Sequence, residues 1–209
     1  MASKKLDVII AGSGPAGSTL GRLLAQQGLD VLVLERRTFP RYKPCGGGVT
    51  PKALKYLPPK DFPVEKVISE LVFLYRYGDP LRVSYGEPLI YLTSREKLDG
   101  FLAEECALAG ALLHQGETVT HCEVSEKDVR VVTDKGTYSA EIVCAADGAR
   151  STVRRSLGLH VPLVRGMAID SMIEADADYP AVILNHGSSP SGYEWIFPKN
   201  GYISSGMGT

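Results

Sequence analysis

The sequence has few of the features that mark secreted, metal-binding or membrane-spanning proteins. Its four cysteines have no Cys-x-x-Cys spacing, which argues against a disulfide framework and a structural zinc site. Its four histidines have no ligand spacing either, so we expect no bound metal. The first apolar run is short and ends in glycines, which is typical of a buried strand and not of a signal peptide or membrane span. We therefore expect a cytosolic protein.

The sequence also lacks an excess of charge of either sign. Its 23 basic and 24 acidic residues give a formal net charge of −1, and the basic residues are scattered, which argues against nucleic acid as a partner. A length of 209 residues with 44% hydrophobic residues suits one large domain or two small ones. We find no internal repeat. The sequence ends in an expected strand with no cap or tail, which predicts that it is a fragment of a longer protein.

The hydrophobic pattern predicts an α/β protein whose chain begins with a strand, a helix and a second strand. Helix and strand signals then alternate with turns rich in glycine and proline. The expected helices cover residues 16–27, 51–56, about 94–110, capped by Thr93 with Glu96, and a segment capped by Ser151. Leu98, Phe101, Leu102, Leu108 and Leu112 should mark the inner face of the third helix. The expected strands cover residues 6–11, 31–34, 67–77, 81–85, 89–92, 118–124, 129–133, 142–146, 167–175, 181–185, 193–197 and 202–205.

These elements suggest two domains, each made of two chain segments. Residues 1–62 and 93–160 should form a Rossmann-like nucleotide-binding domain. Residues 63–92 and 161–209 should supply strands of an inserted and following antiparallel β domain that binds substrate, and this domain is incomplete in the sequence.

The strongest motif is the glycine-rich turn after the first strand, Gly12-x-Gly14-x-x-Gly17. Gly12 permits a tight turn, Gly14 lets a pyrophosphate approach the helix N-terminus, and Gly17 permits close packing of the helix on the strand. Glu35 ends the second strand, where a carboxylate accepts hydrogen bonds from an adenosine ribose and repels a 2′-phosphate. The motif indicates an ADP-containing cofactor but does not choose between FAD and NAD.

A resemblance makes that choice. Residues Asp7 to Leu54 resemble the start of the geranylgeranyl reductase family, within the p-hydroxybenzoate hydroxylase-like flavoproteins, above all at Arg41-x-Lys43-Pro44-Cys45-Gly46-Gly47-Gly48. Similar elements follow at Asp147-Gly148 and at Tyr193-Glu194-Trp195-Ile196-Phe197-Pro198. The resemblance implies FAD as the cofactor. It implies cofactor contacts from Gly12, Gly14, Pro15, Ala16, Gly17, Glu35, Arg36, Arg41, Cys45, Gly46, Gly47, Arg95, Asp147 and Gly148.

The resemblance also implies a substrate site. Tyr193, Trp195 and Phe197 share one face of a strand by its period of two, and in the family this face lines a cavity for an isoprenoid chain. Cys45 matches a family cysteine near the reaction site and is our candidate catalytic residue.

Each of these motifs also has a purely structural interpretation. The aromatic strand can be part of a core, and the Pro-Cys-Gly-Gly-Gly segment can be a flexible loop with a small thiol. Asp147 can belong to a turn before a helix, and Arg95 can be a solvated charge.

The implied reaction is reduction of carbon–carbon double bonds in an isoprenoid or lipid substrate by flavin hydride transfer. The electrons would come from ferredoxin or NAD(P)H, and a lipid substrate is compatible with peripheral contact with a membrane surface. Two alternatives stay open, namely an FAD-dependent monooxygenase or halogenase of the same fold and a non-catalytic nucleotide-binding fragment. The sequence leaves open the substrate, electron donor, proton donor, oligomeric state and FAD retention.

Overall fold

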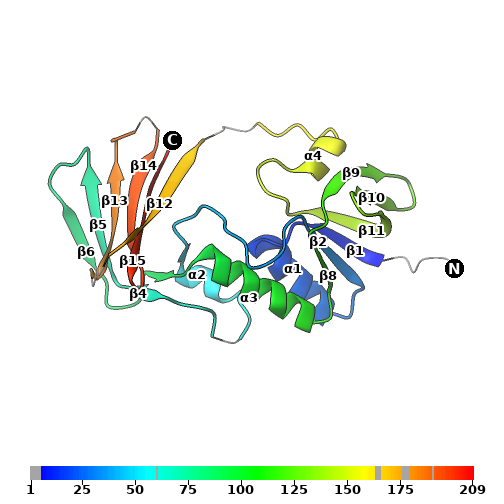
Figure 1. Cartoon of the computed structure of the whole chain (residues 1–209), viewed down its shortest axis with the longest axis horizontal. Coiled ribbons are helices and arrows are strands. Elements are labelled where there is room, and N and C mark those ends of the chain that lie inside the picture. The colour runs from blue at the N-terminus through cyan, green and yellow to red at the C-terminus, as the bar shows by residue number, and fades with distance from the viewer. Residues whose placement is uncertain (1–5, 60, 163–165, 176–178, 190) are drawn as a thin grey trace. The chain divides into compact units, whose positions relative to one another are not determined.

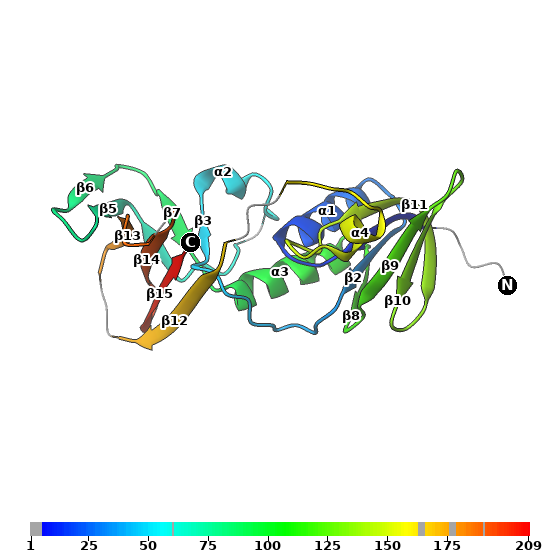
Figure 2. The same cartoon turned by 90° about the horizontal axis from the view of Figure 1, so that it is seen from above.

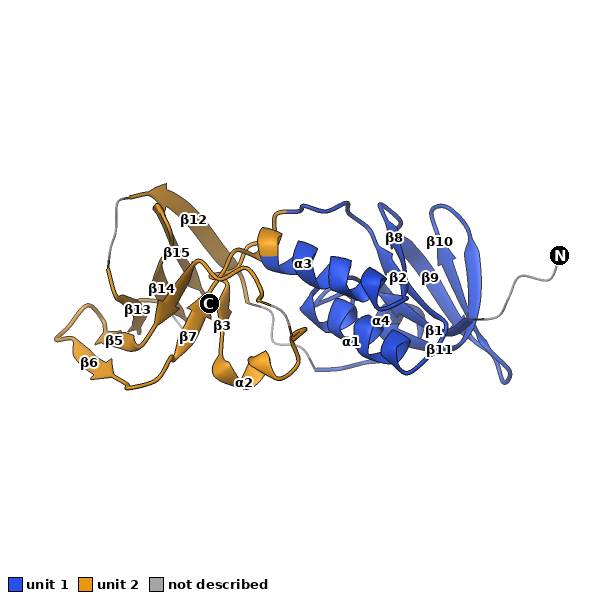
Figure 3. Cartoon of the chain, turned by 90° about the horizontal axis from the view of Figure 1, so that it is seen from below, with its two compact units in different colours: residues 1–41, 98–162 blue, residues 42–97, 163–209 orange. Residues whose placement is uncertain are grey.

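The chain forms two compact units, each made of two segments. The computed structural model describes residues 6–59, 61–162, 166–175, 179–189 and 191–209. Unit 1 comprises residues 1–41 and 98–162, and unit 2 comprises residues 42–97 and 163–209 (Figure 3). The chain therefore leaves unit 1 after Arg41 and returns to it at Leu98. No helix in the described part of the chain is long and apolar enough to cross a membrane.

Unit 1 contains a six-stranded sheet in the order β8-β2-β1-β11-β10-β9 (Figure 1). Its strands are β1 (Leu6–Ala11), β2 (Val31–Glu35), β8 (Leu112–Gln115), β9 (Val119–Val124), β10 (Val129–Thr133) and β11 (Thr137–Ala145). Its helices are α1 (Pro15–Gln26), most of α3 (Arg95–Leu108) and α4 (Thr152–Ser156).

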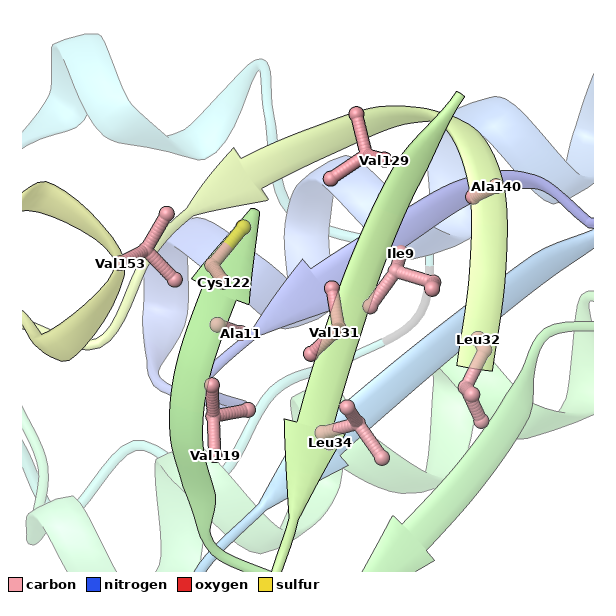
Figure 4. Close-up of a cluster of buried hydrophobic side chains, with 10 residues drawn as sticks. All are labelled: Ile9, Ala11, Leu32, Leu34, Val119, Cys122, Val129, Val131, Ala140 and Val153. Carbon is pink, nitrogen blue, oxygen red and sulfur yellow. The ribbon is translucent and has the colours of Figure 1, made fainter. Parts of the chain in front are cut away.

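The centre of this sheet is parallel and is covered on both faces. Strand β1 pairs in parallel with β2 and β11, and β2 pairs in parallel with β8. All five residues of β2 are buried, as expected for a parallel strand between two layers. One face packs against side chains of β9, β10 and α4, and this cluster is drawn in Figure 4. The other face packs against residues of α1 and α3.

Strand β11 bends so that its two halves have different partners. Residues Thr137–Ala140 pair antiparallel with β10, whereas Ala140–Ala145 pair in parallel with β1. The sequence predicted only the second half as a strand, because the first half, Thr-Tyr-Ser-Ala, lacks a run of apolar residues. The bend lets one strand belong both to the parallel centre and to the β9–β10 hairpin.

Unit 2 contains a six-stranded sheet in the order β12-β15-β14-β13-β5-β6 and a three-stranded sheet in the order β3-β7-β4 (Figure 2). The strands of the large sheet are β5 (Glu70–Tyr75), β6 (Leu81–Ser84), β12 (Ala168–Glu174), β13 (Ala181–His186), β14 (Tyr193–Pro198) and β15 (Tyr202–Gly208). The small sheet consists of β3 (Gly48–Val49), β4 (Lys66–Ile68) and β7 (Ile90–Leu92), and the helix α2 (Pro51–Leu54) follows β3.

A small apolar cluster joins the two sheets of unit 2. Ile68 of β4, Leu92 of β7 and Val182 of β13 are fully buried in it. Only the pair β5–β13 is parallel in the large sheet. The prediction of antiparallel strands here is therefore largely confirmed.

Four details of the predicted elements are wrong. The expected strand 67–77 is interrupted at Ser69, because β4 and β5 belong to different sheets. Helix α3 is capped by Ser94, whose Oγ accepts a hydrogen bond from Lys97 N, and not by Thr93. Leu108 is 67% exposed and so does not lie on the inner face of α3. Leu112 lies in strand β8, which the sequence did not predict.

The compact units also divide the chain at different residues from the expected domains. Residues 42–62 lie in unit 2, whereas the sequence assigned them to the nucleotide-binding domain. The compact units describe packing within the chain and not the binding of a cofactor or substrate, so the predicted functional domains and their boundaries stay a prediction.

Two glycines in helices give a matched test of packing in unit 1. At Gly21 of α1, a Cβ would lie 2.7 Å from Cys106 Sγ and 2.9 Å from Val33 Cγ2, whereas at Gly100 of α3 it would meet nothing within 4 Å. We expect Gly21→Ala to lower the free energy of unfolding by about 1–3 kcal/mol through overpacking. Gly100→Ala should raise it by up to about 1 kcal/mol through helix propensity. Urea denaturation of both variants is the measurement, and equal effects at the two sites would contradict this description of α1 packing.

Candidate functional site

The turn between β1 and α1 is shaped by two glycines that no other residue could replace without displacement of the backbone. Gly12 has a φ of +97°, and a Cβ there would lie 2.5 Å from the carbonyl oxygen of Ala146. A Cβ at Gly17 would overlap the carbonyl oxygen of Gly12. In the described chain no side chain caps the N-terminus of α1, which has Pro15 in its first turn. The first-turn backbone of α1 is therefore available to an anionic group.

Glu35 is held beside this turn by backbone donors. It is buried, and its Oε2 accepts a hydrogen bond from Ser13 N at 3.0 Å while its Oε1 accepts one from Arg37 N at 3.1 Å. A carboxylate has about four acceptor positions, so beside these two donors and the Arg41 contact described next, Glu35 retains capacity for at least one further donor, such as a ribose hydroxyl.

Arg41 connects Glu35 to a second buried carboxylate. Its Nη1 lies 3.0 Å from Oδ2 of Asp99, which is fully buried, and its Nη2 lies 3.5 Å from Glu35 Oε2. Its Nη2 also donates to Ser13 O at 3.4 Å. Arg41 Nε is buried and has no hydrogen-bond partner within the described residues. Arg41 thus fixes the position of Glu35 and of the glycine turn together, and retains one free donor.

Asp147 follows β11 at the carboxyl end of the parallel strands, the edge at which open α/β sheets bind ligands. Its Oδ2 accepts hydrogen bonds from Thr152 N at 2.6 Å and Val153 N at 3.3 Å in the first turn of α4, whose N-cap is Ser151, as predicted. Its Oδ1 is buried, and no described residue donates to it. Oδ2 of Asp147 therefore has the structural role expected of a turn before a helix. Oδ1 is an acceptor suited to the hydroxyl group of a ligand.

These features fit an ADP-containing cofactor. The uncapped N-terminus of α1 suits an anionic pyrophosphate, and the acceptors Glu35 and Asp147 suit hydroxyl groups. Of the other residues predicted for this role in unit 1, Ala16, Arg36 and Gly148 are exposed. In the described residues no group of three or more His, Cys, Asp or Glu side chains is placed to hold a metal ion.

In unit 2, the glycine-rich loop before β3 is pinned by hydrogen bonds at both ends. Cys45 N donates to Asp170 Oδ2 at 3.2 Å, and Gly47 O accepts from Thr93 N at 2.9 Å. Gly47 has a φ of +71°, and a Cβ there would overlap the Thr93 carbonyl oxygen. These contacts hold the backbone of the loop at Cys45 and Gly47, and the role of the loop beside a cofactor stays a prediction.

This loop forms one wall of a pocket of about 630 Å³ within unit 2. The structure brings six of the predicted residues together around it, namely Cys45, Gly46, Gly47, Tyr193, Trp195 and Phe197. The predicted shared face of the three aromatic residues is confirmed by this placement. Their contact with a substrate stays a prediction.

Trp195 combines the two interpretations considered for the aromatic strand. Only 8% of it is exposed, so it is largely core, yet it lines the pocket. A Cβ at Gly46 would lie 2.7 Å from Phe197 Cε2 and 3.3 Å from Trp195 Nε1. On the neighbouring strand a Cβ at Gly206 would overlap the indole ring. The two glycines therefore make the space that Trp195 and Phe197 occupy.

A second, smaller recess of about 20 Å³ lies beside the loop and contains a buried cation. Lys199, Cys45 and Arg95 are among its lining residues. Lys199 is 3% exposed, and its Nζ donates to Thr93 O at 2.6 Å. Burial lowers the pKa of the Lys199 ammonium from 10.5 to about 8, although the negative charge of Glu65 acts in the opposite direction.

Sequence reasoning missed Asp99, Asp170 and Lys199. Asp99 follows Leu98 in a helix whose pattern gives no sign that a carboxylate is fully buried, and Asp170 lies in an exposed strand far from Cys45 in the sequence. Lys199 directly follows the aromatic strand in the sequence. This position was the one sign that it could lie near the proposed substrate site.

Comparison with known proteins identifies relatives over nearly the whole chain. Residues 5–200 match the FAD binding domain family. The menaquinone reductase of Mycolicibacterium smegmatis is 32% identical over 98% of this chain and 55% of its own length. The geranylgeranyl diphosphate reductase of Rhodobacter capsulatus is 31% identical over 98% of this chain and 55% of its own length. The chain thus spans about half the length of the curated relatives it matches.

Solved structures agree with these relatives in fold. A geranylgeranyl bacteriochlorophyll reductase-like protein from Thermoplasma acidophilum superposes with a TM-score of 0.86 at 26% identity, over 98% of this chain and 56% of that one. Halogenase PltM in complex with phloroglucinol and FAD superposes with a TM-score of 0.78 at 20% identity, over 97% of this chain and 51% of that one. The similarity to the halogenase shows a shared fold, and a sequence identity of 20% supports no inference about a shared activity.

The buried Lys199 predicts a specific dependence of stability on pH. Because its pKa is lower in the folded chain than in the unfolded chain, the unfolded chain binds more protons between the two values, and stability should rise with pH in that range. From pH 8 to pH 10, the free energy of unfolding of the wild type should increase relative to that of Lys199→Met by up to about 2 kcal/mol. Urea denaturation at both pH values measures this difference, and parallel profiles for the two proteins would contradict it.

Proposed function

The chain belongs to the FAD binding domain family, and from this membership we propose that its parent protein is an FAD-dependent reductase of isoprenoid carbon–carbon double bonds. The observation that carries the proposal is the pocket of unit 2, where a glycine-rich loop faces an aromatic strand. Apolar walls of this kind suit a hydrocarbon chain. The two curated relatives described above are named menaquinone reductase and geranylgeranyl diphosphate reductase, and the second name specifies an isoprenoid substrate.

The residues of unit 1 would bind the ADP half of FAD. We assign the pyrophosphate to the N-terminus of α1, the ribose hydroxyls to Glu35, and a further hydroxyl to Asp147 Oδ1. Arg41 keeps Glu35 in place and offers its free Nε–H to an oxygen of the cofactor. Arg36, Arg95 and Gly148 are assigned to FAD by resemblance alone.

The residues of unit 2 would bind and orient the substrate. When bound, FAD in its reduced form supplies a hydride for a double bond. Tyr193, Trp195 and Phe197 exclude water from the apolar chain and fix its position. Cys45 lies in the loop that forms one wall of the pocket, and we propose it as the residue nearest the reacting carbons.

The electron donor would be ferredoxin or a nicotinamide cofactor, and a lipid substrate would bring the parent protein to a membrane surface. Consumption of oxygen together with a hydroxylated or halogenated product would instead assign the protein to the monooxygenase or halogenase alternative. Colourless 209-residue protein that does not take up FAD would favour the non-catalytic fragment.

Glu35→Gln tests the cofactor assignment. The amide keeps the size of the side chain but loses the charge that pairs with Arg41 and one acceptor oxygen. We expect the Kd for FAD of the full-length parent protein to rise roughly tenfold or more, which corresponds to about 1.4 kcal/mol. Isothermal titration with FAD measures this, and the exposed Glu123→Gln is the matched control. An unchanged Kd for FAD in Glu35→Gln would show that the ribose lies elsewhere.

Tyr193→Ser tests the substrate assignment without truncation of a core residue, because Tyr193 is 43% exposed. In the full-length protein, FAD content and melting temperature should stay near the wild-type values, while kcat/KM for an isoprenoid substrate should fall roughly tenfold. Tyr56→Ser, at a tyrosine that is 53% exposed and does not line the pocket, is the control and should have no effect on turnover. Wild-type kcat/KM in Tyr193→Ser would remove the support for the pocket.

A further inference from the structure

We propose that a row of aromatic rings on the large sheet of unit 2 is a track for the polyprenyl tail of the substrate, which leads from the pocket to the edge strand β6. The row consists of Trp195, Tyr193, His186 and Phe73. This inference rests on the proposed function and adds to it a path over the sheet for the part of the substrate tail that extends beyond the pocket.

The row is continuous in space although its residues come from three strands. The ring centroids of Trp195 and Tyr193 lie 6.0 Å apart, and those of Tyr193 and His186 lie 5.3 Å apart. The His186 and Phe73 rings are stacked, with centroids 5.5 Å apart and an interplanar angle of 16°. Trp195 and Tyr193 line the pocket, so the row begins at its wall.

The far end of the row reaches an apolar sheet edge. Phe73 pairs with Leu81 of β6, and Leu81 is 63% exposed. The path from β14 across β13 and β5 to β6 crosses three strand spacings, which is about 14 Å at about 4.8 Å each. A chain that fills the pocket can therefore continue over the sheet by several isoprene units.

Part of the aromatic row is exposed to solvent, unlike the side chains of a hydrophobic core. His186 is exposed and Tyr193 is 43% exposed, so the described residues leave this part of the face uncovered. The alternation along β6 separates Leu81 and Val83, which share the face of the row, from Arg82 and Ser84 on the opposite face. Edge strands that face water usually carry charged side chains, whereas this face of β6 is apolar. The pattern is that of a surface that binds an apolar partner.

Continuity with the pocket identifies that partner as the substrate tail. A continuous row of aromatic rings offers dispersion contacts to a hydrocarbon chain along its whole length. A tail on this row would bury apolar surface in proportion to its length, so affinity should increase with the number of isoprene units.

Binding of two alcohols of different length tests the track. Trp195 is the only tryptophan of the chain and lies at the pocket wall, so its fluorescence reports binding of either alcohol. The probes are geraniol and geranylgeraniol, titrated into the wild type, Leu81→Asp and His186→Asp. The control is Ser171→Asp, which adds the same charge to an exposed position of the other edge strand, β12, on the opposite face of the sheet.

We expect the wild type to bind geranylgeraniol more tightly than geraniol. Leu81→Asp and His186→Asp should weaken geranylgeraniol roughly tenfold, which corresponds to about 1.4 kcal/mol, and leave geraniol unchanged. Ser171→Asp should match the wild type for both alcohols. Melting temperatures measured alongside should be equal for all four proteins.

Each contrary result has a distinct meaning. Equal affinity of the wild type for the two alcohols, or full affinity of both row variants for geranylgeraniol, would overturn the track and leave the proposed function standing. Binding of neither alcohol to the wild type would overturn the isoprenoid substrate and the track together. A wild-type dimer that dissociates in Leu81→Asp, detected by light scattering, would assign the row to a contact between two copies of the chain and overturn the track.

Discussion

The ion pair between Arg41 and Asp99 is the contact on which the geometry of unit 1 depends. Arg41 is the last residue of the first segment of unit 1, and Asp99 is the second residue after the chain returns. The pair therefore joins the exit and the re-entry of the chain, and from the same guanidinium a second contact reaches Glu35. A buried carboxylate without a cation is costly, by about 3–5 kcal/mol when one partner of such a pair is removed. The position of Glu35 and the closure of unit 1 thus rest on one side chain.

The nucleotide-binding half could be predicted from the sequence because its signals are local. The limits of β1 match the structure, and β2 differs by one residue, since short apolar runs between glycines leave little freedom of register. Contacts between residues far apart in the sequence had no such local signal. Nothing next to Asp99 in the sequence indicates its partner 58 positions earlier, and nothing in residues 67–77 shows that Ser69 separates two sheets. The cap of α3 was misplaced because Thr93 and Ser94 are both good capping residues and only the backbone decides between them.

The two units illustrate different ways in which glycine serves a binding site. In the turn of unit 1, glycine lets backbone approach backbone and leaves a helix terminus available. In unit 2, Gly46 and Gly206 instead make room for the side chains of Trp195 and Phe197. The first use suits an anionic cofactor group, and the second builds an apolar wall from large rings at little cost in strain.

The cysteines differ sharply in accessibility. Cys106 and Cys122 are buried and Cys144 is half-buried, and burial raises the pKa of all three thiols, that of Cys106 to about 11. Cys45 is exposed and lies at the pocket wall. Because thiolates and not thiols react with alkylating reagents, a maleimide applied near neutral pH should modify Cys45 before the other three. The chain thus carries a natural attachment point for a spin label or fluorophore beside its pocket, with no need to remove the remaining cysteines.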